Sequence, residues 1–224
     1  RTPARQPMPT LEALRGDVAT LTRLVEADLE ALLSGVTDGV VARNLLIDTL
    51  PSLVNTYGSA AATLAADWYD EYRAEQKIAG RFRSIPAELP DQGRTDALAR
   101  WGVEPLFSPE PDTAAAVLRV AGGVQRIVTN AGRYTITGSS IADSSADGWQ
   151  RTGSGTSCSF CALLIARGAV YSERGADFAS HDRCDCFAIP AFNGRPRPVK
   201  PYTPSKRNIS AADRARVREY IRTH

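Results

Sequence analysis

The chain has 224 residues, of which 43% are hydrophobic and 23% charged, a composition typical of a soluble protein of one or two domains. No apolar run approaches the ~18 residues that span a bilayer, and no signal-peptide pattern opens the sequence, so we expect no membrane partner. With no sign of export we expect a reducing compartment, where cysteines favour metal ions over disulfides. Because Arg1 is not a methionine, we expect a processed, trimmed or partial chain.

The N-terminal part, over residues 10–132, has the pattern of a mainly α region. Residues 1–9 hold three prolines and are predicted to form an arm, and Thr10 has the residue type of an N-cap. Apolar residues then follow helical 3-4 spacing at Leu11, Leu14, Val18, Leu21, Val25, Leu29 and Leu32. Further helices are predicted over residues 37–50, 52–77 and 113–130. We expect Pro51 to end the first of these, and the proline-rich residues 80–112 to be linker-like around a short helix near 95–101.

Residues 133–192 are predicted to form a small α+β, cysteine-rich module. Its entrance, residues 134–155, is rich in Gly, Ser, Thr and Asp, and Trp149 is expected to pack beneath the coming site. We predict two short helices, at 139–146 and 162–167. We also predict two short strands, at 169–171 and 187–189, which pair with each other.

All four cysteines form two close pairs, Cys158-Ser-Phe-Cys161 and Cys184-Asp-Cys186, and His181 lies three residues before the second pair. A tetrahedral metal site needs four soft ligands from two short turns, and a Cys-x-x-Cys turn presents two thiolates to one ion. Alternate residues of an extended segment point to one side, so Cys184 and Cys186 can converge as well. We therefore predict structural zinc, bound by four of these five side chains.

Other readings of the same residues are less well supported. Two disulfides are compatible with the spacing if the chain is exported. A redox Cys-x-x-Cys is expected in a thioredoxin-like βαβ unit, and none precedes Cys158. The His-x-Glu and Pro-Cys-x-x-Cys pairing of zinc deaminases is missing from the sequence, and no Ser-His-Asp set can be assigned. A metal hydrolase would need an open coordination position and a general base such as Asp182 or Asp185. We expect no catalytic residues, no small-molecule substrate and no enzyme activity.

Residues 193–224 form a basic, proline-rich tail. It holds nine Lys or Arg residues and two acids, a net charge of +7, which leaves −5 for the rest of a chain whose total is +2. The basic residues are Arg195, Arg197, Lys200, Lys206, Arg207, Arg214, Arg216, Arg218 and Arg222. Its four prolines are expected to keep the first half extended, and Ser210 with Asp213 resembles a capping box of a terminal helix. Such a tail suits nucleic acid, an acidic protein face or solvent.

Four short motifs lie between residues 148 and 192: Gly148-Trp-Gln-Arg151, Cys158-Ser-Phe-Cys161, Arg167-Gly-Ala-Val-Tyr171 and His181-Asp-Arg-Cys184-Asp-Cys186, with Pro190 following. As a set they resemble the MuF-like minor head proteins of tailed phages, those of actinobacteriophages in particular. The preceding helical region agrees with that family in character only. Carried over position by position, the family's cysteine and histidine pattern falls on Cys158, Cys161, His181, Cys184 and Cys186.

The resemblance implies a virion structural protein, a minor capsid protein that aids head morphogenesis and DNA packaging or ejection. Its expected place is the interior of the head near the portal, after assembly in the host cytoplasm. The implied partners are the portal protein, the major capsid protein and phage DNA. Many family members continue into a further module, so we expect a short member or a cleavage product. The alternative is a zinc-ribbon-type nucleic-acid-binding protein.

Overall fold

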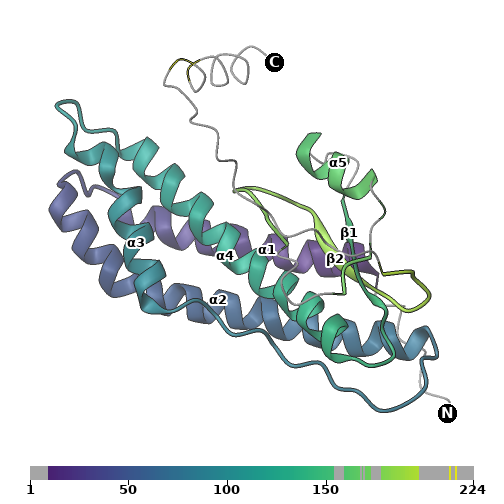
Figure 1. The fold of residues 1–224 in the computed structure, drawn as a ribbon. Coiled ribbons are helices and arrows are strands. Elements are labelled where there is room, and N and C mark those ends of the chain that lie inside the picture. The colour runs from purple at the N-terminus through teal and green to yellow at the C-terminus, as the bar shows by residue number, and fades with distance from the viewer. Residues whose placement is uncertain are drawn as a thin grey trace.

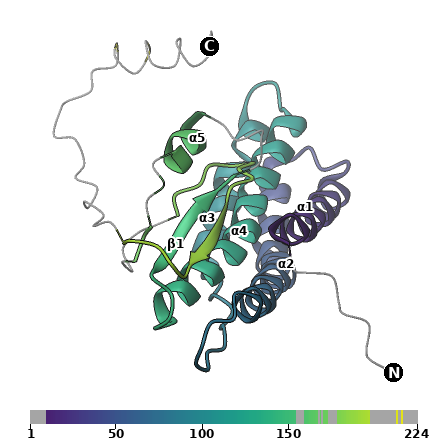
Figure 2. The same cartoon turned by 90° about the vertical axis from the view of Figure 1, so that its right-hand side faces the viewer.

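A computed structural model describes residues 10–153, 159–166, 168, 170–172 and 178–196, together with Ala212 and Ala215. The body is built from four helices, α1 (Leu11–Leu33), α2 (Gly39–Glu75), α3 (Gln92–Gly102) and α4 (Thr113–Ala142). Figures 1 and 2 show α4 between the α1–α2 layer and a two-stranded sheet, and α4 contacts all of these elements. The predicted mainly α fold with a small α+β part is confirmed. The arm at 1–9 lies outside the described residues, as does the tail after residue 196 except for the two alanines.

Helix α1 forms as its periodicity predicts. The Thr10 hydroxyl accepts a hydrogen bond from the Ala13 N–H at 3.1 Å, which confirms Thr10 as the N-cap. One stripe of the helix is buried, at Leu14, Val18, Thr22, Val25, Leu29 and Leu33. This stripe packs on α2 and α4. Among the described residues, none of the helices combines the length and apolar character that crossing a bilayer requires.

The prediction of two helices separated at Pro51 is wrong, because α2 is one helix that contains Pro51. Proline lacks the N–H that would bond to the carbonyl four residues earlier, a cost of about 3 kcal/mol. The buried side chains of Leu46, Leu50 and Val54 continue at four-residue spacing across the proline. Burying each such side chain stabilises the helix by about 1.5–3 kcal/mol, which offsets the missing hydrogen bond. The helix begins at the N-cap Asp38, whose carboxylate accepts from two backbone N–H groups.

Helix α4 also runs further than predicted, so the expected end at 130 and the separate helix at 139–146 are wrong. Its last turns contain residues that are typical of loops, but their hydroxyls are satisfied inside the helix. Thr135 donates to the carbonyl of Ala131 at 2.8 Å, and Ser140 donates to that of Ile136 at 2.7 Å. Helix α4 thus crosses the predicted boundary between residues 132 and 133; the division into separate domains stays a prediction.

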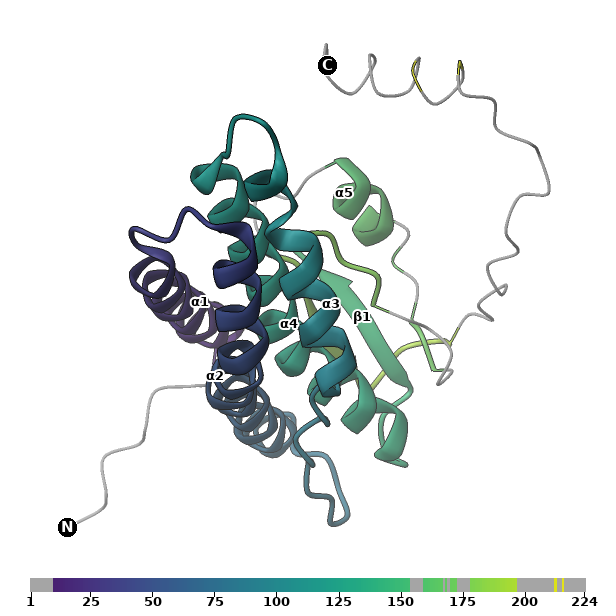
Figure 3. The same ribbon diagram turned by 90° about the vertical axis from the view of Figure 1, so that its left-hand side faces the viewer.

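The linker-like passage contains the predicted short helix, α3, which starts at the N-cap Asp91 and is followed by the 3-10 turn η1 (Glu104–Phe107). Figure 3 shows α3 lying against α4. Gly123 of α4 lies under the side chain of Leu98, where a Cβ atom would clash. The pair Gly122-Gly123 therefore permits close approach of a side chain.

The sheet pairs β1 (Gly148–Thr152) with β2 (Phe187–Ala191) in antiparallel register. The strand at 187–189 is confirmed, but pairing with 169–171 is wrong. Tyr171 instead lies on the other side of β1, where it exchanges backbone hydrogen bonds of 2.9 and 2.8 Å with Trp149. Because both backbone groups of Trp149 point to Tyr171, its partner Pro190 in β2 needs no N–H. Trp149 is 1% exposed and stacks on Phe178, so its predicted packing role is confirmed.

Replacing Gly148 with alanine is expected to lower the free energy of unfolding by about 1–3 kcal/mol. Gly148 has φ of +132°, and its Cβ would clash with the backbone carbonyl of Tyr171. The matched control is Gly138→Ala in α4, where no atom lies within 4 Å of the added Cβ. That change should stabilise the helix by about 0.5–1 kcal/mol. Urea denaturation of both variants measures the difference; equal stabilities would contradict it.

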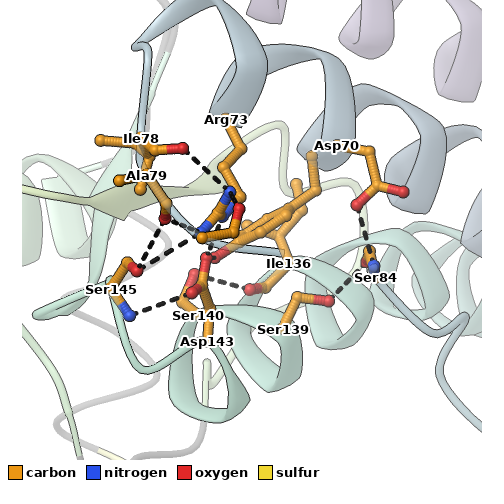
Figure 4. Close-up of polar contacts among 12 residues, drawn as sticks. Asp70, Arg73, Ile78, Ala79, Ser84, Ile136, Ser139, Ser140, Asp143 and Ser145 are labelled. Atoms are coloured by element: carbon orange, nitrogen blue, oxygen red, sulfur yellow. Dashed lines mark hydrogen bonds and ion pairs between the residues drawn. The ribbon is translucent and has the colours of Figure 1, made fainter. Parts of the chain in front are cut away.

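The C-terminal ends of α2 and α4 are joined by a buried ion pair, drawn in Figure 4. Arg73 Nε donates to Asp143 Oδ2 at 2.7 Å, and the two side chains are 8% and 2% exposed. Its other guanidinium nitrogens donate to the carbonyls of residues 78–80. Asp143 also accepts hydrogen bonds from Tyr69 and from the backbone of Ser145. Burial raises the pKa of the Tyr69 hydroxyl, and the negative charge of Asp143 raises it further.

Candidate metal centre

Three of the five predicted ligands converge in the structure. Cys161 lies in α5 (Ser159–Ala166), a helix that begins three residues before its predicted start, and His181 and Cys184 lie in the segment before β2. One ligand atom from each lies within 4.8 Å of the others. Cys186 is fully buried just before β2 and hydrogen-bonds Cys184. Cys158 lies outside the described residues.

The described thiols are separated as they would be around a metal ion. The Sγ atoms of Cys161 and Cys184 are 3.5 Å apart. A disulfide would hold two sulfurs at about 2.05 Å. Two thiolates bound to one tetrahedral zinc at about 2.3 Å lie roughly 3.8 Å apart. No disulfide joins the described cysteines Cys161, Cys184 and Cys186. A metal ion can therefore be bound by two sulfur atoms and one imidazole nitrogen.

The imidazole of His181 is held in the tautomer that a metal ligand needs. Its Nδ1 lies 2.7 Å from the backbone carbonyl oxygen of Asp182. Because a carbonyl oxygen only accepts, Nδ1 carries the proton and Nε2 keeps its lone pair for a metal ion. His181 is exposed while the two thiols are buried, so the imidazole is the solvent-facing side of the cluster.

The surroundings of Cys184 favour its thiolate form. A hydrogen bond from the Cys186 thiol is the largest effect that lowers the pKa of Cys184, and the positive charge of Arg133 and the Cys186 N–H add to it. Burial acts in the opposite direction, and the resulting pKa is about 4. The lowered pKa favours the thiolate, which is the form that binds metal ions.

The central helix α4 contributes Arg133, which is fully buried and was missed by the sequence analysis. Its guanidinium donates to the backbone carbonyls of Cys186 at 2.8 Å and Cys184 at 2.5 Å. A third bond of 2.8 Å reaches the side chain of Asn130, which also accepts from Ser180. These bonds fix the second cysteine pair on α4. An arginine in a helix ordinarily lies on the solvated face, so the sequence carried no signal for this role.

Strand β1 contributes a second arginine, Arg151, which is 7% exposed. Its Nη1 lies 4.0 Å from the Sγ of Cys161, and its Nη2 donates to the carbonyl of Ala179 at 3.1 Å. The guanidinium carbon lies 3.8 Å from the centre of the Phe178 ring, which Arg133 also contacts at 5.0 Å. Arg151 was part of a motif in the sequence, but its contact with a cysteine depends on the β1–β2 pairing.

The segment that carries His181 and Cys184 has a strained backbone, and side chains of α4 bind to it. Ala179 and Arg183 have φ of 40° and 58°, in the left-handed region that side chains other than glycine rarely adopt. The Arg183 N–H donates to the side chain of Gln125 at 2.7 Å, and Asp182 pairs with Arg126 at 3.2 Å. These α4 contacts, together with those of Arg133, explain how the segment is kept in this conformation.

Comparison with known proteins identifies the family. The model of the VG15 protein family matches residues 6–209. The chain belongs to the VG15 protein family. VG15 is a family of phage proteins, so this is a phage protein. No curated protein and no solved structure matches the chain.

The VG15 match covers the helical body, the cysteine cluster and the first part of the basic tail. It supports the phage origin that the resemblance implied, whereas assignment to the MuF-like minor head proteins stays a prediction. Of the nine predicted contact residues in the tail, Arg195 is described, and it is exposed. The preceding residue, Gly194, donates its N–H to Asp147 at 2.9 Å, which holds this part of the VG15 chain beside the start of β1. The other eight lie outside the described residues.

Proposed function

We propose that this VG15 family member is a structural protein of the phage virion, without enzyme activity. Its role is that of a minor capsid protein in head morphogenesis, inside the head near the portal, with the portal protein and the major capsid protein as partners. The observation that carries the proposal is the family match over residues 6–209. The MuF-like motifs between residues 148 and 192 supply the narrower role.

The construction of the metal centre supports a structural role and favours zinc as the ion. Two buried sulfurs and an imidazole nitrogen form a ligand set that zinc prefers over magnesium or calcium. The site lies where the sheet joins α4, and Arg133 bonds its second cysteine pair to that helix. A bound ion there would staple a small module whose described residues after α4 form two short strands and a short helix.

Purified particles of the phage test the proposal. Quantitative mass spectrometry should find the chain in few copies relative to the major capsid protein. Protease added to intact particles should leave it uncut, and opening the heads first should make it accessible. Its absence from particles would overturn the virion assignment. Digestion in intact particles, at a rate matching a known surface protein, would overturn the interior location alone.

The +7 charge of the tail favours phage DNA as an additional partner. The same charge also fits the alternative function, that of a zinc-ribbon-type nucleic-acid-binding protein.

Removing residues 197–224 is expected to weaken binding to duplex DNA at least about ten-fold at low salt, because eight basic residues are lost. Fluorescence anisotropy at two salt concentrations measures this. Full-length chain with Arg81→Ala and Arg83→Ala, two exposed arginines of the body, is the control and should bind normally. Binding that survives the truncation would contradict the prediction.

A further inference from the structure

Two buried arginines approach the cysteine cluster from different elements, Arg133 from α4 and Arg151 from β1. Arg133 holds the carbonyls of Cys184 and Cys186, and Arg151 lies beside the sulfur of Cys161. Among the described residues, no carboxylate forms an ion pair with either guanidinium. A buried cation without an opposite charge is strongly destabilising. Among the described residues, the cysteines are the source of negative charge that acts on these guanidinium groups: Cys184, Cys186 and Cys161 on Arg133, and Cys161 on Arg151.

The two positive charges would be balanced by a centre whose thiolates exceed the charge of the metal ion, as when a third or fourth of the predicted cysteines also binds. A divalent ion bound by two thiolates is neutral, and with three or four thiolates it leaves a net charge of −1 or −2. Two guanidinium groups supply +2. Burying such an ion–thiolate centre without nearby cations would carry the same penalty as burying any unpaired charge. Arginine suits this position because it keeps its charge even where burial lowers its pKa, as it does for Arg133.

We propose that Arg133 and Arg151 are the counter-cations of the metal centre and adapt it to a thiolate-rich, net negative ligand set around a soft divalent ion. Both are positioning residues that act through the cysteines. This inference rests on the zinc centre proposed above and is independent of where the protein lies in the virion.

The geometry separates this role from simple hydrogen bonding. Within the described part of the chain, Arg151 donates to one backbone carbonyl, that of Ala179, and it stacks on Phe178. Its direct contact with the ligands is its charge, 4.0 Å from Cys161 Sγ. Arg133 combines its charge with two carbonyl bonds. Arg133→Lys would keep the positive charge and lose the paired hydrogen bonds to the two carbonyls. Arg133→Met would keep an apolar side chain of similar length and lose both the charge and the hydrogen bonds.

The test measures metal affinity on the full chain. Zinc is titrated in competition with a chromophoric chelator for wild type, Arg133→Met, Arg133→Lys and Arg151→Met. Loss of either charge is expected to weaken zinc binding 10- to 100-fold, and Arg133→Lys should stay within about five-fold of wild type. The control is Arg119→Met, which removes an arginine of α4 that pairs with Glu104 and should leave the affinity unchanged. Cobalt(II) substitution provides a second readout, because thiolate-to-cobalt charge-transfer absorption reports the number of bound thiolates.

Each result has a defined meaning. Wild type that binds neither zinc nor cobalt would overturn the metal centre and this inference together. Normal affinity in both methionine variants would overturn the inference alone, and so would Arg133→Lys binding as weakly as Arg133→Met. If circular dichroism finds Arg133→Met unfolded, Arg151→Met decides the question. A ten-fold loss in Arg151→Met with an unchanged Arg119→Met supports the counter-cation role.

Discussion

Replacing Asp143 with alanine is expected to lower the free energy of unfolding by about 3–5 kcal/mol. The change leaves the buried guanidinium of Arg73 without its negative partner, and it removes the carboxylate that accepts from Tyr69 and Ser145. Asp143→Asn keeps the shape but not the charge, so we expect a smaller loss. Arg73→Met should cost at least as much as Asp143→Ala, because the carbonyls of residues 78–80 also lose their donors.

Urea denaturation with a double-mutant cycle measures this ion pair. The double variant Arg73→Met with Asp143→Leu should be less destabilised than the sum of the two single changes, since neither charge is then left unpaired. The control is Arg83→Met: its ion pair with Asp70 is 3.9 Å long and the arginine side chain is 83% exposed, so the loss should stay below about 1 kcal/mol. Additive effects of the two single changes would contradict a coupled buried pair.

Removal of zinc is expected to lower the free energy of unfolding. The decrease is about 2.7 kcal/mol relative to a solution in which the free zinc concentration is 100 times the Kd. Cys184→Ser should abolish the response to a chelator, because it removes one of the two clustered sulfur ligands. Asp185→Asn replaces the neighbouring residue and retains all three clustered ligands, so this variant should keep the response to the chelator. Thermal unfolding with and without chelator measures the effect.

Elemental analysis and a thiol count on protein purified under reducing conditions accompany the chelation experiment. One zinc per chain, with thiols that react only after chelation, is the expected result. Absence of both metal and free thiols would contradict it and favour two disulfides instead. A wild-type melting temperature that ignores the chelator would contradict a stabilising role for the ion.

The helical body was largely predictable because its signals are local. The N-cap at Thr10 and the apolar spacing after it determine α1 from neighbouring residues alone. The same rules failed at Pro51, where tertiary packing decides, and after residue 130, where Ser and Thr hydroxyls bond within the helix. Buried Leu46, Leu50 and Val54 carry α2 across the proline, and hydroxyl bonds to preceding carbonyls carry α4 through its Ser and Thr residues.

The candidate site was predictable in its ligand types but not in its surroundings. Cysteine spacing placed Cys161, His181 and Cys184 in one cluster, as the structure has them. The choice of β1 as the partner of β2, and hence the position of Arg151, depends on contacts between distant residues. The burial of Arg133 likewise depends on the carbonyls of a segment more than 50 positions later, so no local pattern reveals it.

The unbroken course of α4 has a mechanical consequence. Arg133 fastens the cysteine segment to this helix, and Asp143 fastens the same helix to the end of α2. Ten residues separate the two fastenings, about 15 Å along the axis. A torque applied to the cysteine segment is therefore transmitted to the helical body through α4, which is continuous between the Arg133 and Asp143 contacts. Residue 132, at the predicted domain boundary, lies inside α4 and so does not act as a hinge. We expect the cysteine segment to change its orientation only together with α4.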